Sequence, residues 1–196
     1  MEEIEKKSNL LLKSLNMRCQ FVNKSNEFIM DKFYLDHVCC NGYRSFGKIN
    51  ANMHDIINCI WNIYGNENNI KECDDNICHY KLVNEIDDDT RICYQINNIM
   101  WPYWKRDMLY LQKKVIQDNV SYILMYSVEM NNMTTSDKIV RAYLYVGGYV
   151  ILPTIDGSTH IYRMVAVDFG GNIPYFISSS NIHYRIMDIV KNKLSN

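Results

Sequence analysis

The spacing of apolar residues alternates along the chain between a helical period and a strand-like one. The helical period predicts helices over about residues 1–17, 53–64 and 174–194. The last segment is about 20 residues long, which corresponds to roughly 30 Å and is enough to cross a whole sheet. The apolar residues that carry these patterns are Leu10, Leu11, Leu12 and Leu15, then Ile56, Ile57, Ile60 and Trp61, and finally Ile182, Ile186, Ile189 and Val190.

Strand-like patterns fill the rest of the chain. FIMDKFYLDHV and YRSFGKIN are separated by Asn41-Gly42, which is typical of a hairpin turn. From Cys78 onward, polar or turn-like breaks separate further strands. These strands cover residues 79–86, 90–99, 106–116, 120–130, 138–153 and 159–169. The pattern predicts an α+β fold in which helices pack on one strongly curved antiparallel sheet.

Composition narrows the classes of function. The 196 residues carry 21 basic and 22 acidic side chains, a formal net charge of -1, which argues against nucleic-acid binding as the main task. The chain is rich in Met (11) and Tyr (15). Both types adapt to the irregular wall of a cavity, and both also serve as ordinary core fillers, so two interpretations stay open.

The cysteines do not form a recognisable disulfide framework, which favours a reducing compartment. Cys73, Cys78 and His79 come close to metal-ligand spacing, but no second Cys/His pair follows, so we expect no metal and no cofactor. The start of the chain does not read as a signal peptide, and no apolar run approaches the length of a membrane span. We expect a protein that is cytoplasmic or peripheral to membranes; a targeting segment upstream would lie outside this sequence.

The segment from Ile92 to Leu111, ICYQINNIMWPYWKRDMLYL, resembles the START family of lipid-transfer domains. The family carries a Tyr-Gln, a Trp-Pro and an Arg-Asp-x-Leu-Tyr-Leu at these spacings, and the likeness is greatest to its ceramide-transfer and phosphatidylcholine-transfer types. The match continues through Ser127-Val128, Val140-Arg141-Ala142, Gly148-Tyr149 and the stretch DFGGNIP at 168–174.

The resemblance implies a helix-grip fold over a single domain, residues 1–196, in which the sheet wraps the last helix around a tunnel for one lipid. It also implies a non-enzymatic protein that transfers a lipid between membranes. A lipid that leaves a bilayer exposes its tails at a cost of about 0.8 kcal/mol per CH₂, so a carrier must enclose them.

Family contacts with the lipid head group are carried over residue by residue. Two ceramide-type contacts survive, as Asp74 and Gln95. Met125 stands where that type has an asparagine, and Arg163 where it has a tyrosine. The family's basic residue, four positions before the acid, is Ile70 here.

The phosphatidylcholine type holds choline in an aromatic cage, of which only Tyr145 survives. Its two other aromatic positions are Gln95 and Met108 here. An alternative cage would use Tyr110 and Tyr143. Neither head-group pattern is therefore complete.

Arg163 is the most informative departure from the family. Alternation places it on the inward face with Ile161, Val165 and Val167, where a guanidinium needs a partner. The partner is either Asp74, in a structural pair, or a lipid phosphate, whose oxygens match the guanidinium fork. A bulge that turns the side chain outward is a third possibility.

Other positions complete the expected cavity lining. Tyr110, Gln112 and Ser127 join the set, and Gln112 stands where sterol-binding relatives have a buried arginine. In those relatives an acid pairs with the arginine, and the position of that acid is Cys93 here. The sterol-type ion pair is therefore absent, which argues against cholesterol. We expect a phospholipid first and a ceramide-type lipid second.

The loop of Met100, Trp101, Pro102 and Trp104 is expected to touch membranes, because tryptophan favours the bilayer interface. The alternative is a loop whose aromatics pack over the last helix. We expect framework roles for Arg106 and Asp107, together with Arg141.

The turn into the last helix begins at Asp168. Gly170, Gly171 and Pro174 resemble a hinge and helix start. Ser178, Ser179 and Ser180 follow, either as hydrogen-bond donors above the cavity or as a solvated face.

Two further functions stay open beside lipid transfer by a monomer that touches membranes transiently. One is a lipid-sensing module of a larger chain. The other is an enzyme on the same scaffold, for which the sequence offers no G-x-S-x-G or H-E-x-x-H motif.

Overall fold

The computed structural model of the chain describes residues 2–25, 27–38, 40–130, 138–171, 173 and 182–194. Its helices are α1 (Glu2–Lys13), α2 (Met53–Tyr64), α3 (Glu67–Cys73) and α4 (Ile182–Leu194), with short 3-10 helices η1 (Ser14–Asn16) and η2 (Asp36–Val38). Its strands are β1 (Gln20–Ser25), β2 (Phe28–Leu35), β3 (Cys40–Ile49), β4 (Ile77–Asp87), β5 (Thr90–Asn97), β6 (Lys105–Val115), β7 (Ser121–Ser127), β8 (Ile139–Arg141), β9 (Tyr143–Pro153) and β10 (Thr159–Asp168).

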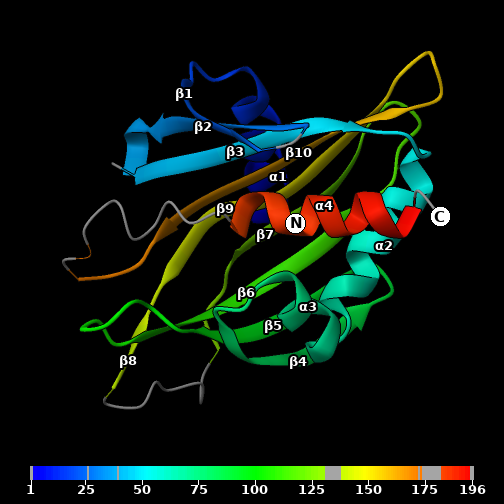
Figure 1. Cartoon of the computed structure of the whole chain (residues 1–196). Helices are drawn as coiled ribbons and strands as arrows, with labels where there is room; N and C mark the ends of the chain where they lie inside the picture. Colours follow the sequence, from blue (N-terminus) through cyan, green and yellow to red (C-terminus); the bar gives the residue numbers. More distant parts are fainter. Residues whose placement is uncertain are drawn as a thin grey trace.

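The strands form one ten-stranded sheet in the order β1-β2-β3-β10-β9-β7-β6-β5-β4. Neighbours along this path are antiparallel, and the short β8 pairs in parallel with β6. The sheet curves around α4, which lies on the same face as α2 and α3, whereas α1 lies behind the sheet (Figure 1). The predicted α+β architecture is confirmed.

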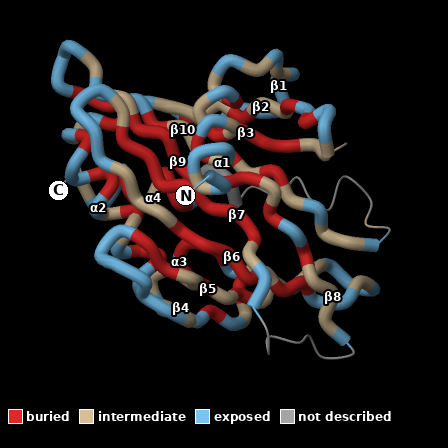
Figure 2. The backbone as a smooth tube through the Cα atoms, turned by 180° about the vertical axis from the view of Figure 1, so that it is seen from behind, coloured by how far each residue is buried: buried red, intermediate tan, exposed pale blue. Residues whose placement is uncertain are grey.

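The alternation of side chains gives the sheet an apolar layer on each face. The inner layer joins the strands to α2, α3 and α4, through residues such as Ile57, Ile60 and Val190. The outer layer packs Leu11 of α1 against Leu124 and other strand residues. Buried residues therefore run along the central strands of the sheet (Figure 2).

Helix α2 has the predicted bounds, because Asn52 caps its start by accepting a hydrogen bond from the Asp55 N–H at 2.9 Å. The Asn-rich stretch that follows α2 both ends this helix and starts the next one. The Asn66 side chain accepts from the N–H groups of Asn68 and Asn69 and starts α3. An asparagine that follows a helix can thus also cap the next one.

The predicted hairpin turn at Asn41-Gly42 is wrong. Both residues lie inside β3, and η2 makes the connection from β2. The glycine is needed for packing, since a Cβ on Gly42 would lie 2.3 Å from the ring of Phe33. The structure also adds β1, which the pattern did not predict, and divides the expected strand 138–153 at Ala142.

The last helix is described only from Ile182 to Leu194. Its expected start, with Pro174 and the serines 178–180, lies outside the described residues. None of the described helices is long and apolar enough to cross a membrane.

Candidate functional site

Asp74, Gln95 and Arg163 come together around one interior cavity of about 40 Å³. They approach it from different elements: Asp74 follows α3, Gln95 lies on β5 and Arg163 on β10. The remaining lining residues are Tyr64, Ile70, Cys73, Ile77 and Ile186. The cavity wall is therefore shared about equally between polar and apolar side chains. Its volume suits a few water molecules, so the expected room for lipid tails is not found at this cavity.

Arg163 is held by two tyrosines. Its Nε donates to the Tyr149 hydroxyl at 3.1 Å, and that hydroxyl lies 3.1 Å from the hydroxyl of Tyr64. Burial raises the pKa of both tyrosines, so they remain neutral at physiological pH. The inward position predicted for Arg163 by alternation is confirmed, because the side chain lines the cavity.

Asp74 is the acidic group of the cavity. Its side chain accepts a hydrogen bond from the Asn76 N–H at 2.9 Å, and the residue is only 9% exposed. Burial raises the pKa of this carboxyl, while the Asn76 hydrogen bond and the charge of Arg163 oppose the shift without cancelling it. Asp74 is thus a carboxylate that is costly to ionise and lies near a fixed cation.

The amide of Gln95 is held in a fixed orientation. Its Oε1 accepts from the Tyr110 hydroxyl at 2.8 Å, and its Nε2 donates to Asn97 Oδ1 at 2.9 Å. Met108 and Met125 pack into the same inner apolar layer. These predicted lining residues share the inner face with the cavity.

Gln112 and Ser127 make structural contacts instead of lining this cavity. Gln112 Oε1 accepts from Arg91 Nε at 2.7 Å, and the Arg91 guanidinium lies 3.7 Å from the centre of the Trp61 ring. The Ser127 hydroxyl accepts from the Leu144 N–H at 2.8 Å and thereby joins β7 to β9.

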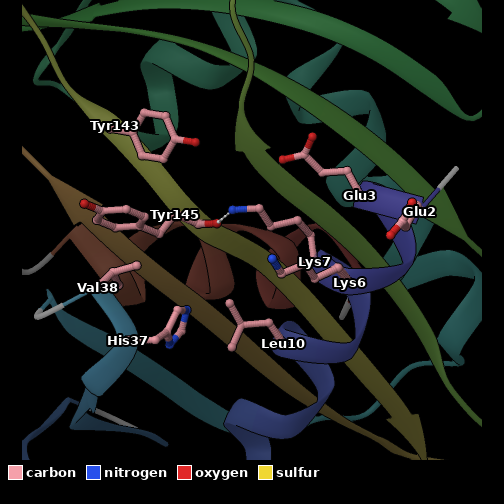
Figure 3. A pocket seen from close by; sticks show the side chains of 9 residues that line it. All are labelled: Glu2, Glu3, Lys6, Lys7, Leu10, His37, Val38, Tyr143 and Tyr145. Atoms are coloured by element: carbon pink, nitrogen blue, oxygen red, sulfur yellow. Dashed lines mark hydrogen bonds between the residues drawn. The ribbon is translucent and has the colours of Figure 1, made fainter.

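The structure does not bring Tyr145 to the cavity. The pairing of β9 with β10 skips Tyr145, and this β-bulge turns the side chain away from the inner face where the family resemblance predicted it. Tyr145 and Tyr143 instead lie on the outer face with ring centroids 5.0 Å apart. Together with residues of α1, they line an open hollow of about 810 Å³ (Figure 3). In this hollow Lys7 Nζ of α1 donates to the Tyr145 carbonyl at 2.8 Å.

The aromatic loop between β5 and β6 lies on the surface. Met100, Trp101 and Trp104 are 58%, 88% and 57% exposed, and Pro102 is exposed as well. These side chains therefore face outward instead of packing over α4. A bilayer interface is the environment that such side chains favour.

Arg106 connects this loop to the turn after β10. Its guanidinium donates to the carbonyls of Trp104 at 2.6 Å, Phe169 at 2.5 Å and Gly170 at 3.1 Å. The turn itself contains Gly170 and Gly171 at positive φ. Arg106 thus fixes two loops that are distant in sequence.

Asp107 is buried and pairs with Arg141 through two hydrogen bonds, at 2.8 and 3.0 Å. The Tyr94 hydroxyl donates to the same carboxylate at 3.1 Å. The framework roles predicted for Arg106 and Asp107 are confirmed by these contacts. Asp168 also belongs to the turn as predicted, because its side chain accepts from the Gly170 N–H at 2.8 Å.

Sequence reasoning missed Tyr64, Tyr149 and Ile186 as cavity residues. Helical spacing from Ile60 to Tyr64 and alternation from Tyr149 to Ile151 do place the two tyrosines on inner faces. Neither pattern says which side chains meet across the fold. Within the described part of the chain, no group of three or more His, Cys, Asp or Glu residues could hold a metal.

Comparisons with known proteins agree on one family. A family model described as "START domain" matches residues 43–196. The fold is similar to human StAR-related lipid transfer protein 5, with a TM-score of 0.82, 14% identity and coverage of 99% of this chain and 95% of that one.

Two other solved structures are similar. The lipid transfer and protein localization domain of human StarD13 (DLC2) gives a TM-score of 0.69 at 16% identity and covers 95% of each chain. A STAR-related lipid transfer protein fragment from Xanthomonas axonopodis gives 0.70 at 12% identity, covering 91% of this chain and 99% of that one. Comparison with curated protein sequences finds no match.

Proposed function

Because the chain belongs to the START domain family, we propose that it binds one lipid in its interior and transfers it between membranes without chemical change. We propose further that residues 1–196 act as a single START-like domain, as a monomer, in the cytoplasm or at membrane surfaces. The lipid head would lie at the cavity of Asp74, Gln95 and Arg163, which are its main polar contacts.

The observation that carries this proposal is the position of Arg163. Ile70, which stands where ceramide- and phosphatidylcholine-transfer relatives have a basic residue, lines the same cavity as Arg163. The cation is thus present at this cavity, but it comes from β10 on the facing wall instead of from α3. The cavity thus has a cation, as in the relatives, although a different residue provides it. A ligand with an anionic group would pair with this cation.

The chemistry of the cavity favours a phospholipid over a ceramide-type lipid. The guanidinium of Arg163 offers a planar fork of donors that matches phosphate oxygens. The hydroxyls of Tyr64 and Tyr149 lie beside it. Asp74 then fits a positively charged or hydroxyl-bearing part of the head.

The size of the cavity implies that the interior must open for the tails. Its 40 Å³ is far below the roughly 300–1,000 Å³ of a typical ligand site. Ile70, Ile77 and Ile186 line the cavity and also belong to the inner apolar layer. We propose that α4, which carries Ile186, moves outward when a lipid enters.

Membrane contact is assigned to the loop of Met100, Trp101, Pro102 and Trp104. Exposed aromatic side chains of this kind gain free energy in the interfacial region of a bilayer. Arg106 ties this loop to the turn after β10, so contact with a membrane would act on the end of the sheet that leads toward α4.

Arg163→Gln tests the head-group assignment. Loss of a buried charged contact costs at least about 2 kcal/mol, so we expect phospholipid binding to weaken by roughly 30-fold or more. Ceramide binding should change much less. Both are measured by extraction of labelled lipid from vesicles, followed by transfer to acceptor vesicles.

Lys48→Gln is the matched control, because Lys48 forms an exposed ion pair with Asp156, and neither residue belongs to the cavity or to α4. It should bind both lipids normally. Equal losses of phospholipid and ceramide in Arg163→Gln would remove the phosphate assignment. Binding without transfer in the wild type would favour a lipid sensor instead.

A further inference from the structure

Ser45 on β3 is a buried polar residue that the structure leaves without a partner. The residue is 0% exposed, and no hydrogen-bond partner for its hydroxyl is found within the described part of the chain. An unsatisfied buried hydroxyl costs about 1–3 kcal/mol. Such a group needs an explanation beyond packing.

Ser45 is not among the residues that line the cavity, but its strand register places it next to one of them. In the strand register Ser45 lies directly opposite Arg163 of β10, which in turn lies opposite Tyr149 of β9. On its other side Ser45 lies opposite Met30 of β2. Met30 and Tyr149 belong to the inner apolar layer, so the Ser45 side chain faces the interior and not the outer face.

Of the two side chains directly opposite Ser45, Met30 is apolar and Arg163 is a hydrogen-bond donor. Directly opposite side chains on paired antiparallel strands have Cβ atoms about 4.5–5.5 Å apart, which places the hydroxyl next to the stem of Arg163. From Ser45, a row of donors continues through the Arg163 guanidinium to the hydroxyls of Tyr149 and Tyr64. Asp74 is the carboxylate among the residues that line the cavity.

A ligand that contacts both Ser45 and Arg163 would bring two or more oxygen acceptors close together. A glycerophospholipid does so, because ester carbonyls lie a few bonds from the phosphate. A sterol brings a single hydroxyl group, which can satisfy only one of these donors. Neighbouring donors on Ser45 and Arg163 therefore suit the glycerol–phosphate region of a diacyl lipid.

We propose that Ser45 is a further lipid contact, which donates its hydroxyl to a phosphate or ester oxygen while Arg163 holds the phosphate. The proposal rests on the proposed lipid-binding function and names glycerophospholipids as the ligand class. It makes Ser45 a specificity-determining residue of the same interior site.

Ser45→Ala tests the proposal through two readouts that move in opposite directions. We expect extraction of pyrene-labelled phosphatidylcholine from dioleoylphosphatidylcholine vesicles to weaken about tenfold, the loss typical of a buried hydrogen bond to a charged acceptor. The melting temperature of the lipid-free variant should rise, because a methyl group needs no partner. A purely structural serine would give no loss of lipid binding.

Ser45→Cys and Ser121→Ala complete the design. The cysteine variant is slightly larger and keeps only a weak donor, so it should show the same loss even if the alanine variant folds poorly. Ser121 is buried, but its hydroxyl contacts the Gln117 carbonyl at 3.4 Å, so its alanine variant should bind lipid normally.

The outcomes separate this proposal from the function on which it rests. Normal phospholipid binding by both Ser45 variants, with weakened binding by Arg163→Gln, overturns the role of Ser45 alone. Absence of phospholipid binding in the wild type overturns both proposals. Equal loss of phospholipid and labelled ceramide in Ser45→Ala overturns the assignment to glycerophospholipids.

Discussion

At the scale of single residues, the cavity joins groups whose charges are costly to bury. Asp74 shows this cost, because burial raises its pKa even though Arg163 and the Asn76 N–H favour the ionised form. The cavity therefore holds an acid that destabilises the lipid-free fold when it ionises. Such a cost is expected where a protein keeps polar groups for a ligand.

Asp74→Asn tests that cost through the pH dependence of stability. The folded-state pKa of Asp74 lies above its ordinary value, so stability is highest below that ordinary value and is lost as the pH rises through the folded pKa. The asparagine variant should escape this loss. Urea unfolding from pH 3.5 to 7 should show it gaining stability relative to the wild type as the pH rises.

Asp156→Asn serves as the control with the opposite sign. Asp156 is an exposed residue whose pKa is lowered by Lys48, with an Nζ–Oδ2 distance of 2.5 Å. Its contribution is present above the ordinary pKa and is lost as the pH falls. Matching pH profiles for the two variants would contradict the role given to burial at Asp74.

At the scale of elements, local breaks in regularity decide which residues reach the interior. The bulge at Tyr145 sends Tyr143 and Tyr145 to the outer face, although the family resemblance predicts an inward Tyr145. On β3, Gly42 keeps the strand continuous under the Phe33 ring. In both places the packing of neighbouring strands overrides the local pattern.

The loop between β5 and β6 is the element with the clearest functional prediction. Trp101→Ala should slow lipid transfer between vesicles several-fold and leave the melting temperature unchanged, because the side chain is 88% exposed and packs on little of the fold. Fluorescence dequenching of labelled lipid measures the transfer rate.

Phe21→Ala is the matched control for that loop. Phe21 is an aromatic residue, 64% exposed, on the edge strand β1, at the other side of the sheet from β4 and β5. Its variant should transfer lipid at the wild-type rate. An unchanged rate in Trp101→Ala would refute membrane contact through this loop.

At the scale of the whole molecule, lipid binding should change the interior as well as fill it. A cavity of 40 Å³ cannot hold acyl chains, so a loaded protein must have a larger inner space beneath α4. We expect native mass spectrometry to find about one lipid per chain, since one enclosed site serves one ligand.

Removal of that lipid should lower stability. A ligand at 100 times its Kd stabilises the folded state by about 2.7 kcal/mol, so delipidated protein should melt earlier and recover when phospholipid is added back. Melting curves with and without lipid measure the shift. A protein that purifies without lipid and melts at the same temperature in its presence would contradict the proposed function.

The sequence by itself determined the α+β class, the bounds of α2 and the inward face of Arg163, because these depend on periodicity and capping within short segments. Through the family resemblance it also singled out Asp74 and Gln95, which the structure places at one cavity. Only the tertiary structure decided that these side chains meet Tyr64 and Tyr149, that Tyr145 faces outward, and that Ser45 lies beside Arg163. Register, bulges and the approach of distant strands set those contacts, and they arise from packing between segments that no local pattern in the chain records.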